Sequence, residues 1–244
     1  MKGHMFDWLF RYANPARFMG LSGRLLPWLT GAAALALAAG LYLGFSAPPD
    51  YQQGRTVMIL FIHVPAAIMT SLVYVCIAVA SLFSLVNRHI LADVAARTAA
   101  PIGAVFTFLA LVTGSLWGKP MWGTFWAWDG RLTATLVQFF LYLGYIALWN
   151  AVEDETKAAR ICAVLALVGA VNIPIIKYSV DWWATLHQGE SIFRAGGPTI
   201  AGVFLWPMAL MMLFYMLLFV CLWLVRIRTL ILERRVRSLM QEAP

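Results

Sequence analysis

The chain has 244 residues, of which 62% are hydrophobic and only 12% are charged, and its mean hydropathy is +0.78. Several uncharged runs are about 18 residues or longer, which is the length of a membrane span, so a soluble globular protein is excluded. The formal net charge of +7 does not indicate nucleic-acid binding, because the basic residues stand in short segments beside apolar runs, as membrane topology signals do.

Six apolar segments predict an all-α polytopic membrane protein that forms one integral membrane domain over residues 1–244. The predicted spans cover approximately residues 25–45, 57–86, 98–117, 132–152, 161–180 and 199–225. The residues before the first span combine four basic side chains with Phe and Trp, which is typical of a segment at the inner membrane surface. A basic tail over residues 226–244 follows the last span.

The distribution of Lys and Arg predicts the orientation of these spans. Thirteen of the 18 lie in the two terminal segments and in the loops near residues 87–97 and 153–160. The positive-inside rule therefore places both termini in the cytoplasm. The segments 46–56, 117–133 and 178–194 then face outward.

The three cysteines, Cys76, Cys162 and Cys221, each lie inside an apolar run. Neither a CxxC pair nor a CxxCH motif is present, which argues against thiol exchange and against a c-type cytochrome. The outward segments contain no Ser/His/Asp or Cys/His constellation, so we do not expect an enzyme that acts alone.

Two of the four histidines are candidates for function. His4 and His89 fall on the cytoplasmic side in charged surroundings and are interpreted as solvated. His63, in FIHVPAA, lies at or just beyond the outer end of the second span if that span ends near Val86. An ionisable residue at such a depth is a functional candidate, although a packing histidine is the alternative. His187, in VDWWATLHQGE, lies in the last outward segment and is otherwise typical of a surface residue.

The outward side also carries seven of the eleven tryptophans. They are Trp117, Trp122, Trp126, Trp128, Trp182, Trp183 and Trp206. An interfacial aromatic belt would explain scattered tryptophans. The aromatic residues within residues 117–133, WGKPMWGTFWAWDGRLT, are spaced too closely for ordinary anchoring at the membrane surface. We predict a short helix here, with Trp122, Phe125 and Trp126 on one face as a flat surface that binds a ligand.

A large flat molecule with a central metal and acidic edges fits this pattern. Heme iron accepts histidine as an axial ligand, and aromatic surface can cover the porphyrin. Arg131, Lys119 and Arg55 could pair with the propionates, with ordinary loop solvation as the alternative. Asp129 is expected to fix the loop through Arg131 or through backbone amides.

At these residues the chain resembles a known family. WDGRLT, HVPAA and WWATLHQG are similar to the cytochrome c maturation protein C family, also called heme exporter protein C, and the resemblance covers nearly the whole chain. It implies that His63 and His187 are the axial ligands of the heme iron. It also implies a set of heme-contacting residues in the tryptophan-rich loop: Trp117, Gly118, Trp122, Gly123, Trp126, Trp128, Asp129 and Arg131.

The resemblance further implies a role in the bacterial cytoplasmic membrane, with the tryptophan-rich loop in the periplasm. Members hold non-covalent heme b and present it to a periplasmic heme chaperone, maturation protein E. They associate with an ABC transporter formed by maturation proteins A and B and with the small membrane protein D. The basic tail could bind the cytoplasmic ATPase, but anionic lipid is the favoured partner.

Two other functions stay open. A heme permease would need polar groups along a path through the spans, and only Asn172, Pro174, Gln138 and Lys177 are available. Contacts between helices would also explain these residues. A structural subunit could instead use its tryptophans to dock a partner protein without binding heme.

Overall fold

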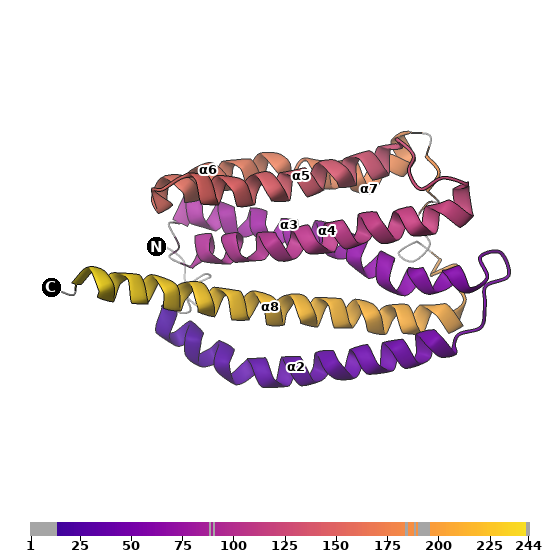
Figure 1. Ribbon diagram of the computed structural model, residues 1–244, viewed down its shortest axis with the longest axis horizontal. Helices are drawn as coiled ribbons and strands as arrows, with labels where there is room; N and C mark the ends of the chain where they lie inside the picture. The colour runs from indigo at the N-terminus through magenta and orange to yellow at the C-terminus, as the bar shows by residue number, and fades with distance from the viewer. Residues whose placement is uncertain are drawn as a thin grey trace.

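The computed structural model describes residues 14–87, 89, 91–183, 185–187, 189 and 196–242. Within these ranges every regular element is a helix, and the all-α prediction is confirmed (Figure 1). The elements are α2 (Pro15–Ser46), η2 (Arg55–Ile59), α3 (Leu60–Asn87), α4 (Ala92–Trp122), α5 (Gly130–Ala151), α6 (Glu155–Gly169), α7 (Asn172–Trp182) and α8 (Gly202–Glu242).

Six helical segments of the described chain are long and apolar enough to cross a membrane, as the sequence predicts. They cover Pro15–Ser46, Arg55–Asn87, Ala92–Trp122, Gly130–Ala151, Glu155–Trp182 and Gly202–Gln241. Most helices extend beyond the apolar segments, because polar residues continue a helix that hydropathy alone cannot follow. The basic tail is the clearest case, since α8 runs through it as far as Glu242.

The fifth of these segments is divided into α6 and α7, whereas the sequence predicts one uninterrupted span. Two short-range hydrogen bonds bridge the division, from Val171 N to Val168 O at 3.2 Å and from Ile173 N to Ala170 O at 3.1 Å. This tighter local hydrogen bonding satisfies backbone groups that would otherwise be unpaired in a membrane.

Local sequence explains several helix ends. Asn14 caps α2 by accepting from Ala16 N at 2.9 Å, and Pro15 follows at the first helical position, where its missing N–H costs nothing. Asp154 caps α6 in the same way. Gly123 ends α4 with φ of 76°, a left-handed conformation that glycine adopts without strain.

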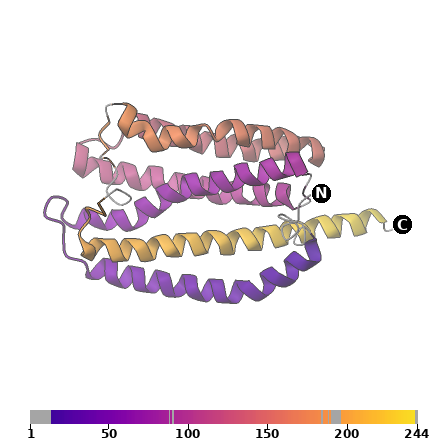
Figure 2. The same ribbon diagram turned by 180° about the vertical axis from the view of Figure 1, so that it is seen from behind.

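The helices form three layers, with α3 and α4 in the middle (Figures 1 and 2). The pair α2 and α8 packs on one side of this layer, and α5, α6 and α7 lie on the other. One end of the bundle holds the residues between α4 and α5 and is called the tryptophan end. The opposite end, called the arginine end, holds the start of α4 and α6 and the last turns of α8.

Buried tyrosines fill the space between α3, α4 and α5. Tyr74 and Tyr142 meet edge to face at 5.1 Å between ring centroids, and Tyr142 Oη donates to Thr70 O at 2.8 Å. Gly103 of α4 lies directly against the Tyr142 ring, where a Cβ atom would overlap it. The absence of a side chain at Gly103 therefore allows α4 and α5 to approach closely.

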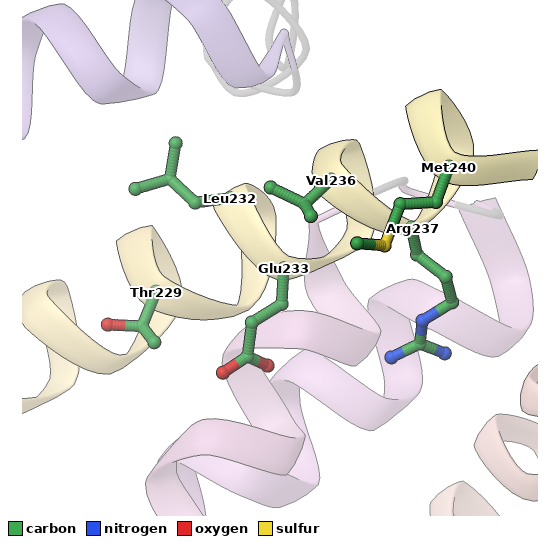
Figure 3. A pocket seen from close by; sticks show the side chains of 6 residues that line it. All are labelled: Thr229, Leu232, Glu233, Val236, Arg237 and Met240. Atoms are coloured by element: carbon green, nitrogen blue, oxygen red, sulfur yellow. The ribbon is translucent and has the colours of Figure 1, made fainter. Parts of the chain in front are cut away.

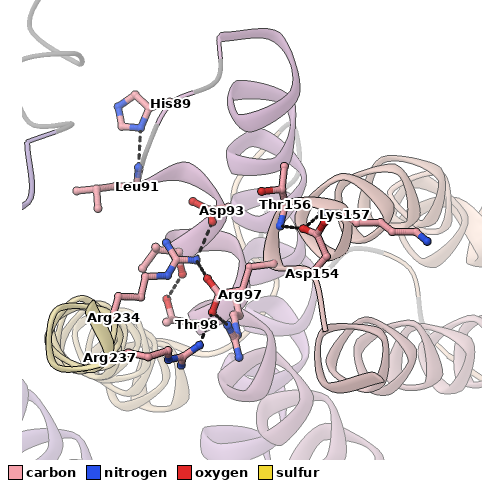
Figure 4. A network of polar contacts seen from close by, with 12 residues as sticks. His89, Leu91, Asp93, Arg97, Thr98, Asp154, Thr156, Lys157, Arg234 and Arg237 are labelled. Carbon is pink, nitrogen blue, oxygen red and sulfur yellow. Dashed lines mark hydrogen bonds and ion pairs between the residues drawn. The ribbon is translucent and has the colours of Figure 1, made fainter. Parts of the chain in front are cut away.

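An ion-pair network joins α4, α6 and α8 at the arginine end (Figure 4). Arg234 lies 2.9 Å from Asp93 and 3.1 Å from Glu155, and Arg237 lies 3.0 Å from Glu155. A shallow hollow of about 460 Å³ follows the same part of α8 (Figure 3). It is lined by Thr229, Leu232, Glu233, Val236, Arg237 and Met240. Part of the basic tail is thus engaged with the chain's own carboxylates.

Replacing Gly103 with valine should destabilise the bundle by about 1–3 kcal/mol, because the added atoms overlap the buried Tyr142 ring. Thermal unfolding of the full chain in lipid nanodiscs measures the effect. Gly144→Val is the matched control, since a Cβ atom at Gly144 meets nothing within 4 Å. Equal melting temperatures for the two variants would contradict the assigned packing.

Candidate ligand-binding site

Two histidines and several tryptophans from separate elements gather at the tryptophan end. His63 lies near the start of α3, and Trp117 and Trp122 lie in the last turns of α4. His187 follows α7 and contacts the loop before α5. Helix packing thus brings together residues separated by more than one hundred positions in the sequence.

The His63 ring is held by α4. Its Nδ1 lies 3.1 Å from Ala110 O and 3.1 Å from Thr113 Oγ1. Because a backbone carbonyl can only accept, Nδ1 carries a proton, and in the neutral ring Nε2 keeps its lone pair. Gly114 makes room for the ring, since a Cβ atom there would lie 2.9 Å from His63 Cε1. Trp117 meets the ring edge to face at 5.7 Å.

The His187 ring is held by a carboxylate. Its Nδ1 lies 2.8 Å from Asp129 Oδ2, and Trp122 meets the ring edge to face at 4.8 Å. Burial lowers the pKa of His187 below its ordinary value, although Asp129 works in the opposite direction. The neutral ring therefore donates through Nδ1, and its Nε2 lone pair is also available to a ligand.

Asp129 connects the loop, α5 and His187. Its Oδ1 accepts from Leu132 N at 2.8 Å and caps α5, which agrees with the expected role of backbone amides. Its Oδ2 accepts from Thr185 Oγ1 at 2.7 Å as well as from His187. Burial acts to raise the pKa of Asp129, but these hydrogen bonds outweigh it, so the pKa lies below its ordinary value and the carboxylate is charged.

The prediction of a short helix with Trp122, Phe125 and Trp126 on one face is wrong. Residues 123–129 form an irregular loop between the end of α4 and the start of α5. Trp122 still belongs to α4, and the left-handed Gly123 turns the chain away before Phe125 and Trp126. The loop aromatics instead contact neighbours edge to face, as Trp126 and Trp128 do at 5.4 Å.

The three basic residues predicted near an acidic ligand occupy different places. Arg131 Nη2 donates to Lys177 O at 3.3 Å. Lys119 Nζ donates to Gly123 O at 3.0 Å and lies 5.2 Å from the centroid of the Phe125 ring. Arg55 is exposed at the start of η2. A role for them in binding carboxylates stays a prediction.

A groove of about 600 Å³ between α5 and α7 opens beside Asp129. It is lined by Trp128, Asp129, Gly130, Thr133, Ala134, Val137, Asn172, Ile175 and Trp183. Among the lining residues, Asn172 Nδ2 donates to Ala134 O at 2.9 Å and to Gln138 Oε1 at 3.2 Å. These two polar side chains thus bind each other and the α5 backbone, as residues that join helices do.

The sequence alone misses the groups that orient the histidines. Ala110, Thr113 and Gly114 lie on one face of α4 at helical spacing, but no pattern pairs that face with His63. Thr185 precedes His187 by two residues and looks like an ordinary loop threonine. Of the residues predicted for the site, Gly118 is buried against the Trp122 ring, with a Cβ position 3.0 Å from Trp122 Cε3.

The fold and the site together define a class of protein, namely an all-α membrane protein with six candidate spans in its described part and with two histidines and a tryptophan-rich loop at one end. Comparison with known proteins narrows the class. The family model described as "Heme exporter protein C" matches residues 8–242, so the chain belongs to the heme exporter protein C family. The resemblance seen in the sequence is thereby confirmed, and the family name describes an exporter rather than an enzyme.

Several proteins with this name are similar over nearly their whole length. Heme exporter protein C of Bradyrhizobium diazoefficiens is 58% identical over 231 residues, which cover 95% of this chain and 88% of the relative. That of Paracoccus denitrificans is 48% identical, covering 95% and 97% respectively. That of Escherichia coli K12 is 47% identical, covering 93% and 92%.

Proposed function

We propose that this chain binds heme at the tryptophan end, between His63 and His187, and presents it to a periplasmic heme chaperone during maturation of c-type cytochromes. The heme is non-covalently bound heme b and is cargo, which leaves with the chaperone. The observation that carries the proposal is that both imidazoles have Nδ1 engaged as a donor, which leaves Nε2 of each free for iron.

The surroundings of the two rings suit a porphyrin. Trp117 and Trp122 support the histidine rings from the side, and Trp126 and Trp128 provide further aromatic surface in the loop. Trp128 has 77% of its surface exposed, so it is accessible to a second protein. Gly123 and Arg131 complete the set of proposed heme contacts, with the Arg131 guanidinium as a partner for a propionate.

We place the tryptophan end in the periplasm and the arginine end in the cytoplasm of a bacterial inner membrane. The excess of Lys and Arg at the arginine end supports this orientation. The proposed partners are the ABC transporter formed by maturation proteins A and B, the chaperone, maturation protein E, and the small membrane protein D. Positioning of heme is the contribution of this chain, and the covalent bond is formed by a residue of the chaperone.

The hydrogen bonds of Asn172 favour this proposal over a heme permease. A permeation path needs several polar groups that can solvate the cargo, whereas Asn172 Nδ2 is occupied by Ala134 O and Gln138 Oε1, although Gln138 Nε2 is buried without a partner among the described residues.

The histidine assignment predicts that His63→Ala and His187→Ala each lower heme retention by about tenfold or more, since loss of an axial ligand exceeds loss of its hydrogen-bond partner. The visible absorption spectrum of the full chain in nanodiscs loaded with hemin measures this. His89→Ala is the control, because His89 lies at the arginine end. A colourless wild-type protein, or variants that keep the six-coordinate spectrum, would rule out the site.

Gly114→Ala should accelerate heme loss without removing a ligand. The added methyl group lies 2.9 Å from His63 Cε1, and the resulting strain of about 1 kcal/mol or more corresponds to a change of roughly fivefold. Transfer of heme to apomyoglobin gives the rate. Gly144→Ala serves as the control with open space at its Cβ, and an unchanged rate in Gly114→Ala would mean that His63 does not bind iron in this orientation.

A further inference from the structure

The two histidines differ in the group that accepts the hydrogen bond from Nδ1. His187 donates to the Asp129 carboxylate at 2.8 Å, and this carboxylate is buried, with 8% of the residue surface exposed. His63 donates to a neutral carbonyl, Ala110 O, and to the Thr113 hydroxyl, both at 3.1 Å. The acceptor next to His187 is charged, whereas both acceptors next to His63 are neutral. The two imidazole rings therefore lie in different electrostatic surroundings.

The two neutral acceptors next to His63 also take part in hydrogen bonds within α4. Thr113 Oγ1 donates its own proton to Leu109 O at 2.6 Å, so towards His63 it can only accept. Ala110 O is a backbone carbonyl of α4 and takes part in the hydrogen bonding of that helix. His63 thus receives two weak acceptors, and neither adds negative charge to the ring.

The partner of His187 is fixed by several hydrogen bonds. Oδ1 of Asp129 is held by Leu132 N at the start of α5, so the carboxylate cannot rotate freely. Thr185 Oγ1 donates to Oδ2 at 2.7 Å and accepts from His187 N at 3.1 Å. The backbone and the ring of His187 are therefore both tied to the same carboxylate.

This difference affects bonding to a metal. A carboxylate that accepts the Nδ1 proton raises the basicity of the opposite nitrogen and strengthens its bond to a metal more than a neutral acceptor does. Nε2 of His187 is therefore the stronger electron-pair donor, and Nε2 of His63 is the weaker one.

We propose that Asp129 is a positioning residue that makes His187 the retained axial ligand of bound heme, and His63 the ligand that is exchanged when heme passes to an acceptor. The proposal rests on the proposed function, because it assumes iron between the two rings. In the exchange, the bond between iron and His63 Nε2 breaks with the electron pair returning to Nε2. A Lewis base from the acceptor donates an electron pair to the vacated position, and no electron is gained or lost by the iron.

The test uses the full chain in nanodiscs, loaded with hemin, reduced with dithionite and exposed to carbon monoxide. Carbon monoxide replaces the weaker axial ligand. After photolysis, resonance Raman spectroscopy records the stretching frequency of the iron–histidine bond that remains. That frequency reports the strength of the bond to the retained histidine, which responds to the acceptor of its Nδ1 hydrogen bond.

Two matched variants remove one acceptor each. Asp129→Asn keeps the size of the side chain and a residue type that caps helices well, but it removes the negative charge next to His187. Thr113→Val keeps a similar shape and removes the hydroxyl next to His63, while Ala110 O still accepts. Both variants retain both histidines, so both are expected to bind hemin.

The expected result is a lower iron–histidine frequency in Asp129→Asn and an unchanged one in Thr113→Val. Heme affinity should also fall by about 10- to 100-fold in Asp129→Asn. A shift in Thr113→Val alone, equal shifts in both, or no shift in either would overturn the proposal. A wild-type protein without a Soret band would instead refute the proposed heme site itself, so the two failures are distinguishable.

Discussion

The hydrogen bond between Asp129 and His187 is the contact on which the tryptophan end depends. Asp129 uses one carboxylate oxygen to begin α5 and the other to hold the segment after α7. The loop between α4 and α5 contributes few regular backbone hydrogen bonds of its own, so this side chain determines where the loop lies relative to His187. Its burial cost is offset by three donors.

The middle layer positions the other half of the site. α3 and α4 pack extensively against each other. This packing brings the face of α4 that carries Ala110, Thr113 and Gly114 against His63. The contact between Gly103 and Tyr142 belongs to the same helix and keeps α5 close. The site thus depends on two helix pairs, α3 with α4 and α4 with α5, and on the segment after α7, which carries His187 and is held by Asp129.

The sequence predicts the fold well because a bilayer imposes a minimum length and apolarity on each span. It also indicates the candidate residues, since His63 and His187 stand out against apolar or aromatic surroundings. It fails over residues 123–129, because the spacing of Trp122, Phe125 and Trp126 suits a helical face, whereas the left-handed Gly123 ends the helix before that face can form. The hydrogen-bond acceptors of the histidines, Thr113 and Asp129, are brought to them by contacts between distant segments. A single sequence, considered without an alignment, does not reveal such contacts.

The division of the fifth span has a mechanical consequence. The part at the arginine end, α6, packs against both α3 and α5, whereas the main neighbour of α7, the part at the tryptophan end, is α5. Trp182 is carried by α7, and Trp183 follows directly after it and lies against Gly130, with a Cβ position there 3.0 Å from the Trp183 ring. Fewer helix neighbours therefore oppose a tilt of α7 than a tilt of α6, and the close approach of Trp183 to α5 depends on the absence of a side chain at Gly130.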